Sequence, residues 1–171
     1  KSVITTVEIK GVRLIDRLRL SWLIFEQKVW SWINLIIITT AYPRGSTPRH
    51  TRGDSRCLIC YYTNATSLNQ EKLDELRFLS VDVRPDIIFI TETWYNRSSI
   101  THIEGYECYR RDRSDKTGGG VCIYGRISSS LTFREIDFRQ LSSAGIEQVW
   151  CEVSTGFESL ILGCIYRPKI L

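Results

Sequence analysis

The sequence predicts a layered α/β fold that is built on a mixed β-sheet, and three observations support this prediction. Residues 68–83 have the apolar spacing of an amphipathic helix. Residues 86–91 form a short, fully apolar run, which is typical of a strand that is buried on both faces. Several further β-rich runs follow them along the chain. One helix among many strands indicates a sheet with a helical layer packed on it.

The predicted elements can be placed in order along the chain. Four apolar residues share one face of the helix: Leu73, Leu76, Leu79 and Val83. Pro85 ends that helix, because a proline disfavours helical geometry in the residue before it. Strands are expected at residues 57–63, 86–91, 105–110, 120–124, 131–136, 147–153 and 160–166.

Composition divides the chain into three parts. Residues 1–42 contain an apolar stripe with members three or four residues apart, which predicts a helical appendage. Residues 43–56 are rich in Pro, Gly, Ser, Thr and Arg, as is typical of a basic linker. Residues 57–171 hold the predicted domain. Charge follows the same division, since residues 1–56 hold ten Lys and Arg against four Asp and Glu, whereas the rest hold thirteen against fifteen.

Two interpretations of the N-terminal stripe stay open. In one, a coiled coil or a membrane-surface helix binds a partner, with self-association through residues 15–36. In the other, the periodicity is accidental. A membrane span is not expected, because Asn34 interrupts the apolar run after Lys28 and leaves it shorter than the roughly 20 residues that a span needs. The basic linker could contact nucleic acid or simply be solvated.

The six cysteines are expected to be buried free thiols, because no secretory pattern accompanies them. Four lie in apolar, strand-like runs: Cys57, Cys60, Cys122 and Cys164. Cys57 and Cys60 have the spacing of a zinc knuckle, but residues three apart on a strand face opposite sides, and no second pair follows. A zinc site is therefore not expected.

Three polar residues are predicted to lie together at the ends of strands. Asn64 follows the first strand of the domain, Glu92 follows the buried strand, and Tyr166 ends the last strand. Ligand sites of open α/β sheets form beyond the carboxyl ends of the strands. A carboxylate in that position suits Mg²⁺, and an amide and a phenol beside it could orient a phosphate or a water. Each residue alone suits a surface turn, and only their joint placement favours a site.

Six short motifs, spread over residues 57–169, carry a family resemblance: YTNATSL at 62–68, PDIIFITETW at 85–94, GY at 105–106, RRDR at 110–113, GGGV at 118–121 and YRP at 166–168. In this order and approximate spacing the chain resembles the endonuclease/exonuclease/phosphatase superfamily. It is most similar to the apurinic-like endonuclease domain at the front of LINE-type non-LTR retrotransposon polyproteins.

The resemblance implies a four-layer α/β sandwich of the DNase I type that hydrolyses phosphodiesters with Mg²⁺ or Mn²⁺. It implies that Asn64 holds the scissile phosphate, that Glu92 binds the metal, and that Tyr166 donates to a phosphate oxygen. DNA is the implied partner, with Arg110, Arg111 and Arg113 near its backbone. The family role further implies a reverse-transcriptase region in a longer polyprotein, and action in the nucleus or cytoplasm rather than outside the cell.

The sequence also departs from the family. It contains no Asp-x-Asn motif and no terminal Asp-His pair, and neither His50 nor His102 has a matching context. Without those residues no evident base activates the attacking water. The sequence also contains no Met. We therefore expect an incomplete domain, the N-terminal part of a longer protein, that is inactive as this chain and whose standing as an enzyme depends on the missing motifs.

Other interpretations stay open or are set aside. One alternative is a phosphatase branch of the superfamily that acts on a phosphoinositide or another phosphoester, and another is a non-catalytic interaction module that uses the N-terminal helix. Gly118–Gly120 is expected to form a hairpin turn rather than a phosphate-binding loop, because a strand follows it. Trp94, Trp150 and Tyr106 are expected to pack in the core or at its rim rather than to stack on bases.

Overall fold

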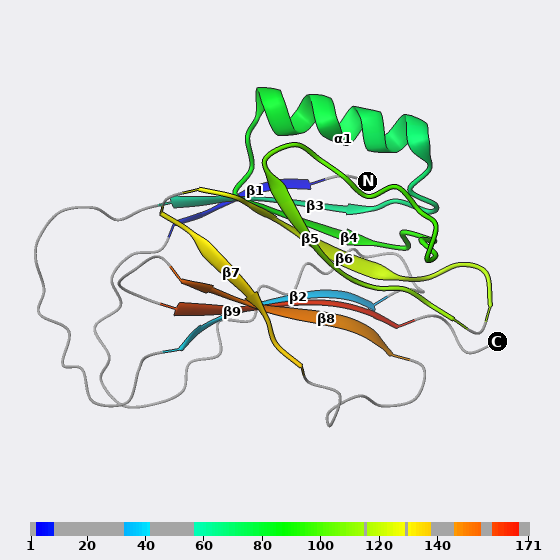
Figure 1. Ribbon diagram of the computed structural model, residues 1–171. Helices are drawn as coiled ribbons and strands as arrows, with labels where there is room; N and C mark the ends of the chain where they lie inside the picture. The colour runs from blue at the N-terminus through cyan, green and yellow to red at the C-terminus, as the bar shows by residue number, and fades with distance from the viewer. Residues whose placement is uncertain are drawn as a thin grey trace, which may run out of the picture.

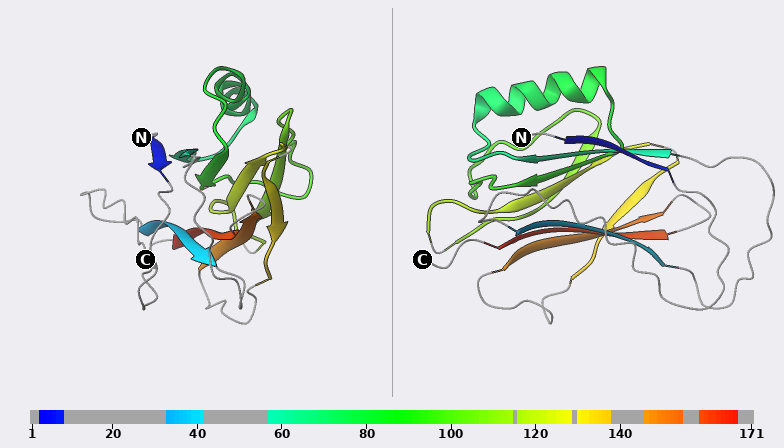
Figure 2. Two further views of the ribbon diagram at one scale, coloured as in Figure 1. Left: turned by 90° about the vertical axis from the view of Figure 1, so that its left-hand side faces the viewer. Right: turned by 180° about the vertical axis from the view of Figure 1, so that it is seen from behind.

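Two β-sheets lie face to face, and a helix covers the outer face of one of them (Figure 1). The computed structural model of the protein describes residues 3–8, 33–41, 57–114, 116–128, 130–137, 146–154 and 159–167, the first two ranges as backbone only. Within these ranges the layers are helix, sheet and sheet, which Figure 2 shows from two further sides. The predicted layered fold of mixed α and β structure is confirmed at this level.

The sheet under the helix has five strands in the order β1-β3-β4-β6-β5. Their bounds are β1 Val3–Glu8, β3 Cys57–Asn64, β4 Ile87–Thr91, β6 Val121–Arg126 and β5 Tyr106–Arg111. β3 and β4 run parallel, and the other neighbours run antiparallel. The predicted mixed sheet is thus confirmed, and the carboxyl ends of β3 and β4 meet at one edge.

The second sheet has four antiparallel strands in the order β2-β9-β8-β7. Their bounds are β2 Ile33–Ala41, β9 Ser159–Arg167, β8 Glu147–Ser154 and β7 Thr132–Glu135. All of the strands predicted between residues 57 and 166 are present, with ends that agree within two residues. Their short apolar runs carry a strong local signal, and this explains the agreement.

The predicted N-terminal helix is wrong for residues 33–41, which form β2 and pair with β9. This run is dominated by Ile and Thr, and β-branched side chains favour strands over helices. Residues 3–8 also form a strand, β1, which pairs with β3. The rest of the predicted appendage and the linker at 43–56 lie outside the described residues.

The helix α1, Gln70–Asp82, agrees with the helix predicted at residues 68–83. Asn69 caps its start, since the Asn69 side chain accepts a hydrogen bond of 3.0 Å from the Lys72 amide. The chain leaves the helix through Arg84, which has a φ of 52°, and then enters Pro85. Among the described residues, no helix is long and apolar enough to cross a bilayer.

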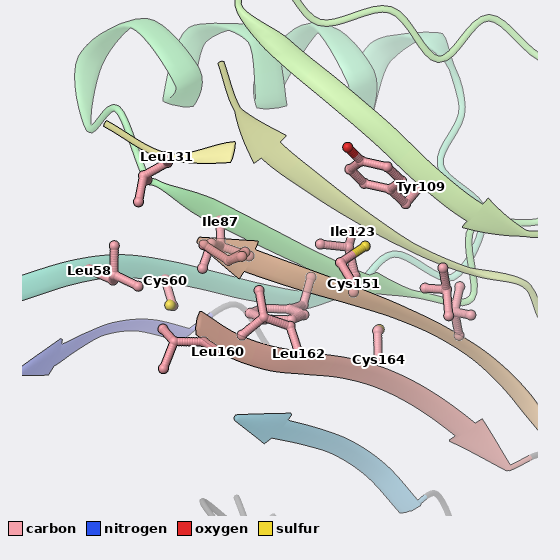
Figure 3. Close-up of a cluster of buried hydrophobic side chains, with 14 of the residues drawn as sticks. Leu58, Cys60, Ile87, Tyr109, Ile123, Leu131, Cys151, Leu160, Leu162 and Cys164 are labelled. Atoms are coloured by element: carbon pink, nitrogen blue, oxygen red, sulfur yellow. The ribbon is translucent and has the colours of Figure 1, made fainter. Parts of the chain in front are cut away.

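Two hydrophobic cores hold the layers together. The larger core lies between the sheets and includes Ile87 of β4, Ile123 of β6 and Leu162 of β9, each with no exposed surface (Figure 3). The smaller core joins α1 to the five-stranded sheet through Leu73 and Ile88. Because β4 contributes to both cores, it is buried on both faces, as its apolar sequence predicts.

The cysteines with described side chains are free and mostly buried, as predicted: Cys60, Cys108, Cys122, Cys151 and Cys164. Burial raises the pKa of the Cys60 thiol from 9.0 to about 12, with a smaller contribution from the Asp86 carboxylate. Burial likewise raises the pKa of Cys164 from 9.0 to about 12. Both thiols are therefore protonated at neutral pH and inert as nucleophiles.

Alkaline pH is expected to destabilise the fold through these two thiols. The folded state holds their protons more tightly than the unfolded chain does, because the folded pKa is raised. Their contribution to stability is complete below about pH 9 and is lost as the pH rises toward 12. The free energy of unfolding in urea should therefore fall by roughly 1.4 kcal/mol per thiol for each pH unit above about 9. Replacing both thiols by Ala should reduce that slope and leave the part that comes from Cys122 and Cys151, whose pKa values burial also raises, and an unchanged slope would contradict this account.

Candidate functional site

The parallel pairing of β3 and β4 brings Asn64 and Glu92 to the same edge of the five-stranded sheet. Asn64 lies opposite Thr91, the last residue of β4, and Glu92 follows directly. The two connections stay hydrogen-bonded beyond the strands, since the Ser67 amide donates to the Glu92 carbonyl at 2.9 Å. The Asn64 side-chain oxygen accepts hydrogen bonds of 3.1 Å from the Thr66 amide and hydroxyl. The turn after β3 is thus fixed next to Glu92.

Tyr166 reaches the same place from the other sheet. It lies near the end of β9, and its hydroxyl donates a hydrogen bond to Glu92 Oε1. Both side chains are buried, with 2% of Tyr166 and 9% of Glu92 exposed. The structure therefore brings Glu92 and Tyr166 into contact across the interface of the two sheets, and it places Asn64 at the same edge, where Thr66 donates to the Asn64 side chain.

Burial controls the protonation of the phenols around Glu92. Burial raises the pKa of Tyr166, and the hydrogen bond to Glu92 raises it further, while Arg113 opposes the shift. Burial also raises the pKa of Tyr62, whose hydroxyl lies 3.2 Å from Thr91 Oγ1. Both phenols are consequently hydrogen-bond donors at any physiological pH.

The backbone after β4 adopts an unusual conformation. Glu92 and Trp94 both have a φ of 55°, in the left-handed region that residues other than glycine rarely adopt. Two hydrogen bonds to the glycine loop at residues 118–120 hold this segment, with 2.8 Å from the Trp94 amide to the Gly119 carbonyl and 3.3 Å from the Thr93 amide to the Gly120 carbonyl. Strain that is held in this way is characteristic of functional sites.

The glycine loop needs its glycines for close packing. Gly118, Gly119 and Gly120 have φ values of 95°, 71° and 81°. A Cβ on Gly119 would lie 2.4 Å from Arg113 Nη2, and a Cβ on Gly120 would lie 2.5 Å from Thr93 Oγ1. The loop ends the connection at 112–120 between the paired strands β5 and β6, so it belongs to a hairpin, as predicted, but not to a tight turn, and it packs against the site.

Glu147, which the sequence analysis missed, anchors this loop. Its carboxylate accepts hydrogen bonds from Arg113 and from the Gly120 amide. Only 11% of the Arg113 side chain and 12% of the Glu147 side chain are exposed. Glu147 pairs with Tyr166 across β8 and β9, so this ion pair adjoins the Glu92–Tyr166 contact. A signal existed, because Glu147 occupies the same inward alternation as Val149, Cys151 and Val153, where a charge needs a partner.

The three arginines predicted to bind DNA have different surroundings. Arg110 lies 3.5 Å from Asp112, and its guanidinium lies 5.6 Å from the centre of the Tyr95 ring. Arg113 is paired with Glu147. Arg111 is exposed on the edge strand β5. Arg111 is therefore the best placed of the three to reach a phosphate backbone.

The aromatic residues that were predicted to pack differ in their exposure. Tyr106 is buried and donates a hydrogen bond of 2.6 Å to the Pro85 carbonyl. Trp150 covers Gly163, where its ring atoms lie within 2.8 Å of the place that a Cβ would take. Packing is confirmed for those two residues. Trp94 is not a core residue, because 42% of it is exposed, and it lies at the rim.

The site can be compared with the needs of a divalent metal. Among the described residues, no group of three or more His, Cys, Asp or Glu side chains could hold a metal ion. Glu147 is already bound by Arg113, so Glu92 is the carboxylate that remains for a metal. Mg²⁺ keeps several waters and is often held by one or two carboxylates together with substrate phosphates. A single buried carboxylate beside a phenol donor fits that mode of binding.

The histidines do not join this site in the described structure. His102 is exposed in the loop before β5, where its ring lies 3.3 Å from Glu104. Its carbonyl accepts hydrogen bonds from Arg77 of α1, on the helical side of the sheet. His50 lies outside the described residues.

The chain has no significant match among protein-family models, curated proteins or solved structures.

Proposed function

We propose that the chain is part of a Mg²⁺-dependent phosphodiesterase of the endonuclease/exonuclease/phosphatase type, from the branch of retrotransposon endonucleases that nick DNA. The observation that carries this proposal is the buried hydrogen bond from Tyr166 to Glu92, with Asn64 beside it. These residues come from three different strands and from both sheets. A carboxylate and a phenol that meet from two sheets suit a phosphate and its metal better than a structural cap, which needs only local partners.

Each residue has a role that follows from its chemistry. Mg²⁺ (or Mn²⁺) bound at Glu92 would supply positive charge that polarises a phosphate and stabilises a leaving oxygen. The Tyr166 hydroxyl stays protonated because its pKa is raised, so it can turn to donate to a non-bridging phosphate oxygen as charge develops there. Asn64 lies at the edge where the phosphate would be held. Arg111 would add affinity for the DNA backbone that does not depend on sequence.

The proposal also covers the complete fold of the domain and the catalytic residues that this sequence lacks. Two sheets with a helix on one outer face agree with three layers of a four-layer, DNase I-like sandwich. The sequence holds no Asp-x-Asn motif, so none of its residues matches the base that the family uses to activate water. In this proposal the chain binds the phosphate and the metal but does not cleave on its own. A longer polyprotein with a reverse transcriptase, acting in the nucleus or cytoplasm, completes it.

Two other functions make different predictions. A phosphatase of the same superfamily would need the same Glu92 and Tyr166, but it would act on a phosphoinositide or another phosphoester. A non-catalytic module would need neither residue, and a peptide of residues 15–36 would self-associate. The strand at residues 33–41 counts against a helical module that runs through this segment.

Nicking of supercoiled plasmid in Mg²⁺ tests the proposed function. This chain should be inactive, whereas a protein extended through an Asp-x-Asn motif and an Asp-His pair from a related element should nick the plasmid. EDTA should abolish the nicking, and soluble phosphoinositides should not be hydrolysed. Nicking by the present chain would show that another base exists. Hydrolysis of phosphoinositide without nicking would move the protein to the phosphatase branch, and inactivity of both proteins would favour the non-catalytic module.

A further inference from the structure

The rim of the candidate site carries an exposed tryptophan that the proposed function leaves unused. Trp94 follows Glu92 by two residues, and 42% of it is exposed. The other large apolar side chains that are exposed in the described part of the chain lie elsewhere: Phe78, Val81, Ile100 and Ile127. Single exposed apolar residues are common on protein surfaces, and what distinguishes Trp94 is the way in which its backbone is held.

The backbone fixes Trp94 in its exposed position. Its φ of 55° is a genuine outlier for a bulky residue and costs on the order of 1–3 kcal/mol. The hydrogen bond of 2.8 Å from its amide to the Gly119 carbonyl maintains this conformation. A residue that served only to fill space would gain from a relaxed backbone and a buried ring. The strained backbone instead presents a large, flat side chain at the surface.

The ring lies close to the charged part of the site. A Cβ on Gly118 would lie 3.7 Å from Trp94 Nε1 and 3.9 Å from Arg113 Nη1, so the indole and the guanidinium flank the same glycine. Arg113 is paired with Glu147, which lies opposite Tyr166, the partner of Glu92. A continuous set of contacts therefore connects the aromatic surface to the carboxylate that would bind the metal.

We infer that Trp94 is a stacking surface for a nucleobase next to the phosphate that is held at Glu92 and Tyr166. This inference rests on the proposed function and specifies its substrate. Inositol and lipid headgroups offer no flat ring to an indole, whereas every nucleobase does. In a paired duplex both faces of each base are already stacked, so a surface indole reaches a base only where it is unpaired or flipped out. The substrate class is thus DNA with at least one unpaired base beside the scissile phosphate.

Binding by the present chain in Mg²⁺ tests this inference without requiring cleavage, because this chain is expected to be inactive on its own. The probes are a 12-mer of thymidylate, an abasic 12-mer with the same number of phosphates, and a fully paired 12-base-pair duplex. Binding is measured with the whole chain by fluorescence anisotropy of end-labelled probes. The thymidylate 12-mer should bind about 5- to 150-fold more tightly than the abasic 12-mer, as expected for one stacked base. The duplex carries about twice as many phosphates, so it is compared between variants, and its affinity should be the same for the unaltered protein and Trp94→Leu.

Three variants test whether Trp94 causes the difference in affinity between the base-containing and abasic strands. Trp94→Leu should remove the difference between the base-containing and abasic strands and leave binding of the abasic strand unchanged. Trp94→Phe keeps a flat ring and should retain most of the difference. Trp150→Phe, in β8 of the second sheet where the ring covers Gly163, is the matched control and should change nothing. Thermal unfolding of each variant checks that it folds.

The outcomes separate this inference from the proposed function. Equal binding of the thymidylate and abasic strands by the unaltered protein would overturn the inference, as would a difference that survives in Trp94→Leu or is lost equally in Trp94→Phe. Glu92-dependent nicking by the extended protein without base discrimination would leave the proposed function standing and remove the inference. If Trp94 caused tighter binding of the base-containing strand but the extended protein did not nick DNA, the stacking role of Trp94 would stand and the proposed nuclease function would be removed.

Discussion

Replacing Glu92 by Gln in the extended protein is expected to reduce the rate of Mg²⁺-dependent nicking by about 10³-fold. The substitution removes one negative charge and keeps the shape of the side chain. In the proposed function the substitution removes the main protein ligand of the metal. The metal would then no longer stabilise the charge of the transition state by several kcal/mol, and the activation barrier would rise by that amount. Single-turnover nicking of supercoiled plasmid at saturating protein measures the chemical step directly.

Stability should change little, and this distinguishes a chemical role from a structural one. The amide oxygen introduced by Glu92→Gln can still accept the hydrogen bond from Tyr166, and the cost of burying a charge is removed. Tyr166→Phe should reduce the rate by about 10²-fold, since it removes one donor to the phosphate and leaves the metal ligand in place. Glu104→Gln is the matched control, because the Glu104 side chain is 97% exposed and lies in the loop before β5.

Two results would contradict this assignment. If Glu92→Gln nicked at a rate near that of the unaltered protein, Glu92 would be only a buried acceptor for Tyr166. If the substitution unfolded the protein, the role of Glu92 would be structural. Titration with Mn²⁺ provides a second measurement, because a weakened metal site raises the metal concentration needed for half-maximal rate in a folded variant.

Most of the fold could be predicted from the sequence because its signals are local. Strands such as β4 are short apolar runs between turn residues, and α1 has both a capping residue and a proline beyond its end. The edge that holds Asn64 and Glu92 could also be predicted, because the parallel pairing of β3 and β4 requires it. Tyr166 was harder to place, since it belongs to the other sheet.

The features that were predicted wrongly or missed depend on contacts between residues that are far apart in the sequence. The stripe over residues 15–36 has a helical period, but Ile33–Ala41 pairs with β9, more than a hundred residues later, and that pairing overrides the period. The exposure of Trp94 depends on a backbone hydrogen bond to Gly119, which no pattern in the sequence encodes. The contact of Arg113 with Glu147 joins two hairpins, so the spacing of charges along the chain did not reveal it.

This contact is also the basis of the largest expected effect on stability. Glu147→Ala should reduce the free energy of unfolding in urea by about 3–5 kcal/mol, because it leaves the Arg113 charge buried without its partner. It also leaves the Gly120 amide without an acceptor. Arg113→Ala should cost a similar amount for the same reason. Arg134 and Glu152 form the matched control, since 76% of the Arg134 side chain is exposed and breaking that pair should cost less than about 1 kcal/mol.

The double variant Arg113→Leu with Glu147→Leu separates the charge from the packing. Apolar side chains of similar size commonly replace a buried ion pair at little cost, so the double variant should recover most of the stability that either single change removes. The glycine loop would still lose its anchor, because a leucine at position 147 cannot accept a hydrogen bond from the Gly120 amide. Trp94 and Thr93 depend on that loop for their backbone conformation, so base discrimination should weaken in a protein that remains stable. A cost below about 1 kcal/mol for each single variant would show that the two charges are solvated in solution, and the loop would then need another explanation for its position beside Glu92.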